Sequence, residues 1–132
     1  MEKILEQIRA MCLELNRKYP KYYKTERDPK LCEHIQVPDG ETVLLCHYDT
    51  HFRSGKDVFV ITENGFYTDL MMEHVTHFTP FEKLAVAEQI YETEYVIYAD
   101  NSPLMYSSVV GAAAAESLID LAMSVKRLMT EQ

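Results

Sequence analysis

The chain has 132 residues, a formal net charge of −8 at pH 7, 47% hydrophobic and 26% charged residues. These values are typical of one folded domain spanning residues 1–132, and they exclude a low-complexity chain. The acidic field opposes nucleic-acid phosphates and anionic lipid, so we expect neither a nucleic-acid nor a membrane partner.

The first residues and the cysteines predict a cytoplasmic location. Glu2 and Glu6 interrupt any apolar run of the kind found in a signal peptide, so the N-terminus is expected to be part of the folded protein. The three cysteines, Cys12, Cys32 and Cys46, are scattered and include no CxxC pair. This pattern is typical of reduced thiols in the cytoplasm.

Residues 1–19 are predicted to form a helix that ends before Pro20. Its apolar residues recur every three or four positions, which places them on one helix face. They are Ile4, Ile8, Met11 and Leu15.

Segment 16–30 mixes basic and aromatic residues, which leaves two interpretations open. The residues are Arg17, Lys18, Lys21, Lys24, Arg27 and Lys30 with Tyr19, Tyr22 and Tyr23. The segment is either a small nucleic-acid strip or a solvated connector whose tyrosines pack on neighbouring elements. We favour the connector because the rest of the chain is acidic.

Residues 31–37 fit a short helix or a strand equally well.

Residues 38–106 are predicted to form about seven short antiparallel strands, because the apolar residues now alternate with a period of two. The Asn64–Gly65 pair is a strong hairpin signal. The segment KLAVAEQIYE could instead be a helix. Short strands at this spacing favour a barrel or sandwich, and an amphipathic helix over residues 107–130 is expected to close one end.

Local sequence in the first hairpins resembles the bacterial pleckstrin-homology-like (PH-like) domain family. The matching residues are Asp49, Thr50 and Phe52, then Ser54, Gly55, Lys56 and Asp57, then Ile61 and Thr62, then Gly65, Phe66 and Tyr67. The resemblance covers about Pro38 to Leu128. It implies an α+β, mainly β fold with seven antiparallel strands in two sheets and a C-terminal capping helix. The N-terminal helix is an addition to this plan.

The first hairpin turn also supplies candidate ligand-binding residues, Arg53 and Lys56, to which we add Tyr67. Phosphoinositide binding is not expected, since the turn also holds an acid and the chain is acidic. The turn is not a phosphate-binding P-loop either, because Thr50 and Asp57 stand where that motif needs glycine and Ser or Thr.

His47, Asp49 and His51 form a candidate metal site. Residues at i, i+2 and i+4 of a strand share one face, with about 7 Å between successive members, and two imidazoles with a carboxylate suit zinc or iron. The alternative is a solvent-facing strand surface, because the opposite face holds Leu44 and Cys46. We favour the solvent face and expect no cofactor.

No catalytic constellation is evident, so we expect a protein that is not an enzyme. A non-catalytic protein- or peptide-binding module with a PH-like fold is the favoured function, because such folds present a sheet edge to which a peptide strand can add. The alternative is a small acidic inhibitor or immunity protein that blocks a basic enzyme surface. The N-terminal helix could also mediate a homodimer.

Overall fold

The computed structural model describes residues 2–48, 57–70, 77–91, 94–99, 102–106 and 112–131. In chain order, its elements are α1 (Glu2–Lys18), β1 (Tyr23–Lys24), α2 (Pro29–His34), β2 (Val43–Tyr48), β3 (Asp57–Thr62), β4 (Gly65–Leu70), β5 (His77–Pro80), the 3-10 helix η2 (Phe81–Lys83), β6 (Leu84–Tyr91), β7 (Glu94–Ala99), β8 (Ser102–Tyr106) and α3 (Ala112–Thr130). None of the helices in these ranges is both long enough and apolar enough to span a bilayer.

The strands form two antiparallel sheets, with orders β1-β2-β3-β4-β5 and β6-β7-β8. The α+β class is confirmed. The barrel is not, because no strand pair joins the two sheets among the described residues. The count of seven strands is not confirmed either. Each of the seven predicted segments holds a strand, but the two-residue strand β1, too short to show a period, precedes them.

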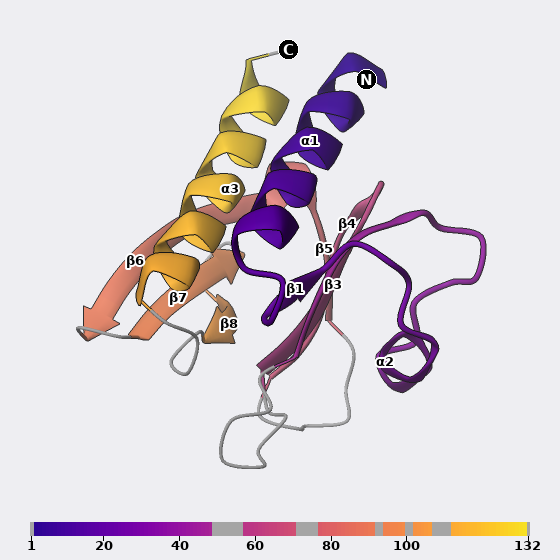
Figure 1. The fold of residues 1–132 in the computed structure, drawn as a ribbon. Coiled ribbons are helices and arrows are strands. Elements are labelled where there is room, and N and C mark those ends of the chain that lie inside the picture. The colour runs from indigo at the N-terminus through magenta and orange to yellow at the C-terminus, as the bar shows by residue number, and fades with distance from the viewer. Residues whose placement is uncertain are drawn as a thin grey trace.

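The two segments left open by the sequence now have one structure each. Residues 31–37 include most of α2, a helix that begins at Pro29. KLAVAEQIYE contains the strand β6, which pairs with β7. Figure 1 shows α1 over one face of the five-stranded sheet, here called the inner face, with α3 beside α1 and against β6 and β7. α2 lies beyond the opposite, outer face.

The main core lies on the inner face. α1 buries Ile8, Cys12 and Leu15, which its helical spacing places on one side. α3 adds Leu118 and Val125 to the same cluster. Burial of one large apolar side chain stabilises a fold by about 1.5–3 kcal/mol, so this layer contributes to holding both helices against the strands.

A column of six rings runs through the main core. It consists of Tyr19, Tyr23, His47, Phe59, Phe66 and Phe81, with successive ring centroids 6.4, 5.2, 5.2, 5.9 and 6.3 Å apart. These separations are those of interacting aromatic pairs. The column connects the end of α1 to η2 through the four strands β1 to β4.

α2 covers the outer face and builds a second cluster, here called the outer cluster. Its residues are Leu31, Cys32, Ile35, Val37, Cys46, Val60 and Tyr67. The helix begins where it does because the carboxylate of Asp28 accepts a hydrogen bond from the backbone nitrogen of Leu31 at 3.0 Å, with Pro29 in the first turn. β2 and β3 are thus buried on both faces, which accounts for their continuous apolar runs.

The hairpin predicted at Asn64 and Gly65 is present, and Gly65 begins its second strand. β3 ends at Thr62 and β4 begins at Gly65, so the glycine is a strand residue. A Cβ added at Gly65 would lie 2.3 Å from the backbone oxygen of Thr79 and 2.9 Å from the Cα of Pro80. Glycine is required here because β5 approaches β4 too closely for a side chain.

Candidate functional site

His47, the first residue of the metal hypothesis, lies in the main core. Its side chain is 1% exposed and packs between Tyr23 and Phe59. Nδ1 lies 3.0 Å from the backbone oxygen of Tyr22. Because a carbonyl oxygen can only accept, Nδ1 must carry the proton and donate it. The prediction of a solvent-facing histidine was wrong. Alternation places successive side chains of β2 on opposite faces of the sheet, but it does not show that other elements cover both of these faces.

The other ring nitrogen of His47 is buried and has no hydrogen-bond partner among the residues that the structure describes. Burial lowers the pKa of His47 to about 4, against an opposing effect of the bond to the Tyr22 carbonyl. The other members of the metal hypothesis, Asp49 and His51, lie outside the described residues. Within the described ranges, no group of three His, Cys, Asp or Glu side chains could hold a metal ion. His47 therefore acts as a neutral core residue.

Among the candidate ligand-binding residues, Arg53 and Lys56 lie outside the described part of the chain, and Tyr67 lies within it. Tyr67 is 8% exposed, and its hydroxyl donates a hydrogen bond to the carboxylate of Glu41. The hydroxyl of Thr62 donates to the same carboxylate at 2.8 Å. The hydroxyl of Tyr67 is thus engaged within the protein, so the residue can present only its ring to a ligand.

Glu41 is held ionised beside the outer cluster. Burial raises its pKa, but hydrogen bonds from Tyr67, Asn64 and Thr62 and the positive charge of Arg27 outweigh this effect, so the pKa lies below its ordinary value. This polar cluster ties the loop before β2 to β3 and β4. It also fixes the ring of Tyr67 in position.

Arg27 also stabilises the loop before β2, through hydrogen bonds to its backbone. Its guanidinium donates to the backbone oxygens of Glu41, Val37 and Pro38 at 3.1, 3.0 and 3.2 Å. It also lies 3.5 Å from the carboxylate of Asp39. A guanidinium suits this role because its several N–H donors project in a fixed fork. Arg27 is therefore a structural clamp.

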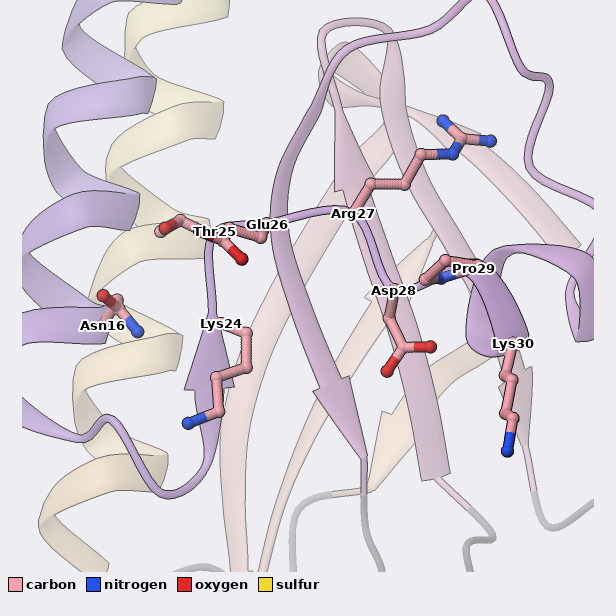
Figure 2. A pocket seen from close by; sticks show the side chains of 8 residues that line it. All are labelled: Asn16, Lys24, Thr25, Glu26, Arg27, Asp28, Pro29 and Lys30. Carbon is pink, nitrogen blue, oxygen red and sulfur yellow. The ribbon is translucent and has the colours of Figure 1, made fainter.

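A groove of about 650 Å³ opens along the segment that joins β1 to α2. Its lining residues are Asn16, Lys24, Thr25, Glu26, Arg27, Asp28, Pro29 and Lys30 (Figure 2). Figure 2 shows the side chain of Arg27 directed away from those of Asp28 and Lys30. Acidic and basic side chains alternate along this lining, so it is not the basic strip that the sequence left open.

The tyrosines and several of the cations of segment 16–30 make contacts within the fold, as the connector interpretation expects. Tyr23 is fully buried and its ring packs against Tyr19. Arg17 pairs with Glu14, and the ammonium of Lys24 donates to the backbone oxygen of Pro20. These groups are already engaged, which supports the connector interpretation. The absence of a nucleic-acid partner stays a prediction.

The last strand of the five-stranded sheet offers a different kind of site. In the described part of the chain, β5 pairs with β4 alone, so its other edge has no strand beside it. Phe78 on β5 is 44% exposed, and its ring centroid lies 4.7 Å from that of Tyr67. Tyr67 belongs to the outer cluster, so Phe78 extends this apolar surface to the sheet edge.

Sequence reasoning missed this edge, although a signal for it exists. Pro80 ends β5, and proline within a sheet is found mainly on edge strands because it has no N–H to donate. Phe78 alternates with the buried Thr79, which places the aromatic ring and the core contact on opposite faces. Pro80 alone would have predicted an edge strand. The outward direction of Phe78 follows only from the structure, because alternation does not say which face is buried.

Comparison with known proteins identifies no relative. No protein-family model, curated protein or solved structure matches the chain. The resemblance to PH-like domains stays an expectation from the sequence, and the function must be argued from the described geometry.

Proposed function

We propose that the chain is a non-catalytic, PH-like module that binds an extended peptide as an additional strand beside β5. The observation that carries this proposal is the free edge of β5, which pairs with no second strand in the described ranges and carries the half-exposed Phe78. Main-chain hydrogen bonds along such an edge provide affinity, and pockets or rings for alternate side chains provide specificity.

The order of elements supports the PH-like part of the proposal. From β2 to β8, seven antiparallel strands are divided between two sheets, and the helix α3 follows them. α3 contacts β6 and β7, as a helix that caps the second sheet would. In this scheme α1, β1 and α2 are additions to the common plan, and α2 protects the outer face beside the proposed site.

Contacts within the protein position the aromatic platform for the peptide. The ring of Phe78 rests on Tyr67, and the hydroxyl of Tyr67 is held by the ionised carboxylate of Glu41. A preorganised aromatic contact loses little conformational entropy on binding. Because the chain carries a net charge of −8, we expect the peptide to place an apolar side chain on Phe78 and basic residues at neighbouring positions.

The test is selection of random peptides displayed on phage, followed by measurement of Kd for synthetic versions of the enriched peptides. We expect Phe78→Ala to weaken binding about 30-fold, the loss of about 2 kcal/mol typical of a central aromatic contact. The matched control is Met123→Ala, because Met123 is also exposed but lies on α3. Melting temperatures of both variants establish that they are folded.

Amide hydrogen exchange locates the bound peptide. We expect the amides of β5 to become protected when peptide is added. Peptides that bind equally well to the Phe78→Ala variant and leave β5 unprotected would refute strand addition at this edge. If the protein instead captures a basic protein with an affinity that falls steeply with salt, the acidic inhibitor alternative is favoured, since that interaction is driven by charge.

A further inference from the structure

Two of the three cysteines meet between α2 and β2. Cys32 on α2 and Cys46 on β2 are both buried in the outer cluster, close enough for the side chain of Cys46 to lower the pKa of Cys32. Cys12 lies in the main core, on the other face of the sheet. The fold therefore brings together one specific pair of thiols, although nothing in their sequence spacing marks them as a pair.

The pair lies directly behind the segment that lines the groove of Figure 2. The thiol of Cys46 donates a hydrogen bond to the backbone oxygen of Glu26 at 3.5 Å. The backbone nitrogen of Cys32 donates to the backbone oxygen of Asp28 at 2.9 Å. Glu26 and Asp28 both line the groove, so the segment that forms its wall is hydrogen-bonded to both cysteines.

The surroundings keep both sulfurs protonated at rest but favour Cys32 as the first to react. Burial raises the pKa of the Cys46 thiol to about 11, and its hydrogen bond to a carbonyl would be lost on deprotonation. Burial also raises the pKa of Cys32. The charge of Arg27 and a backbone hydrogen bond from Asp28 oppose the increase at both thiols, and a hydrogen bond from the side chain of Cys46 opposes it at Cys32 alone. The thiolate is the nucleophile in disulfide exchange. Because both thiols are buried and protonated, the reaction requires local opening of the segment that joins β1 to α2.

We propose that Cys32 and Cys46 are a reversible dithiol site that closes to a disulfide with a small disulfide oxidant such as oxidised glutathione. The Cys32 thiolate attacks one glutathione sulfur and releases the other glutathione as a thiolate, which takes up a proton. The Cys46 thiolate then attacks the sulfur of Cys32 and releases the second glutathione. The two cysteines lose two electrons and two protons, and the oxidant gains them.

The disulfide would tie α2 to β2 and close the loop from residue 32 to residue 46. A cross-link of this length restricts the unfolded chain, so we expect the unfolding equilibrium constant to fall about 10- to 100-fold on oxidation. The bridge would also hold the segment that lines the groove. This inference does not depend on peptide binding at β5, so either proposal can fail while the other stands.

The test uses the intact, folded protein in glutathione buffers of graded ratio, with equilibrium approached from both the reduced and the oxidised side. Slow access to the buried thiols then affects the rate but not the result. After an acid quench and alkylation of free thiols, intact mass and non-reducing peptide maps identify the product. We expect one intramolecular bridge between Cys32 and Cys46, formed with the loss of two hydrogen atoms and reversed by reduced glutathione.

Single variants make the assignment specific. We expect Cys12→Ala to form the bridge as the wild type does, and Cys32→Ala or Cys46→Ala to form none. A bridge that includes Cys12, or glutathione adducts with no bridge at equilibrium, would overturn the proposal. So would a bridged protein that unfolds in less urea than the reduced form, because the native geometry would then not accommodate the bond.

Discussion

Acid should destabilise this protein in part through His47, and the variant His47→Phe should lack this sensitivity. Burial lowers the pKa of His47 from 6.5 to about 4. Above about pH 6.5 the ring is neutral in both states, so it contributes no pH dependence. Between about pH 6.5 and 4 only the unfolded chain takes up the proton, so the free energy of unfolding falls as the pH falls. Below the folded-state pKa both states are protonated and the loss is complete.

The size of the effect follows from the same pKa values. Each pH unit across this window changes the free energy of unfolding by about 1.4 kcal/mol, so the full loss is about 3 kcal/mol. That is a large part of the 5–15 kcal/mol that is typical of a domain, to order of magnitude. Phenylalanine suits the site because His47 already packs between the rings of Tyr23 and Phe59.

Urea unfolding followed by circular dichroism from about pH 8 to about pH 4 measures this loss. The carboxyl groups titrate in both proteins, so the difference between wild type and His47→Phe isolates the histidine. We expect this difference to move by about 3 kcal/mol in favour of the variant as the pH falls. The control His77→Gln removes a histidine that is exposed on β5 and tests whether the effect is specific to His47. A difference between wild type and His47→Phe that is constant with pH would refute the buried, neutral state of His47.

Three further substitutions test the outer face and its loop by urea unfolding. Gly65→Ala should cost about 1–3 kcal/mol, since the added methyl meets the β5 backbone, whereas the control Gly40→Ala has nothing within 4 Å and should be nearly neutral. Tyr67→Phe should cost about 1–2 kcal/mol at neutral pH by removing a bond to the Glu41 carboxylate. Because the pKa of that carboxyl is lowered in the fold, this cost should disappear as acid protonates it, and a cost that persists in acid would contradict the assignment. Arg27→Lys should cost about 1 kcal/mol or more, because an ammonium cannot reach three separate carbonyls, and amide exchange in residues 37–41 should become faster; an unchanged exchange rate would argue against the clamp.

Elements whose spacing is local were predictable from the sequence. α1 agrees with the helix predicted over residues 1–19 because the repeat of Ile8 and Leu15 depends only on helix geometry. The strands agree with their segments because alternation and β-branched residues act within a few positions. β1 was not predictable in this way, since two residues show no period and the strand exists only through its pairing with Cys46 and His47.

What covers each face was not predictable, and this decided the outcome for the candidate sites. Alternation in β2 separates His47 from Cys46 but does not say that α1 and α3 cover one face and α2 the other. His47 is therefore buried in the core, although the sequence predicted that it would face solvent. The contact between Cys32 and Cys46 depends on the same packing, because α2 must fold back over β2 before the thiols meet.

The column of rings from Tyr19 to Phe81 has a consequence for how the protein unfolds. Each ring touches the next across a strand boundary, so no one of the strands β1 to β4 can leave without exposing the rings on either side. Residues joined in this way tend to open as one cooperative unit. We therefore expect the amides of β2, β3 and β4 to exchange with a common opening free energy, close to that of global unfolding, and the loop over residues 37–41 to open at a lower one.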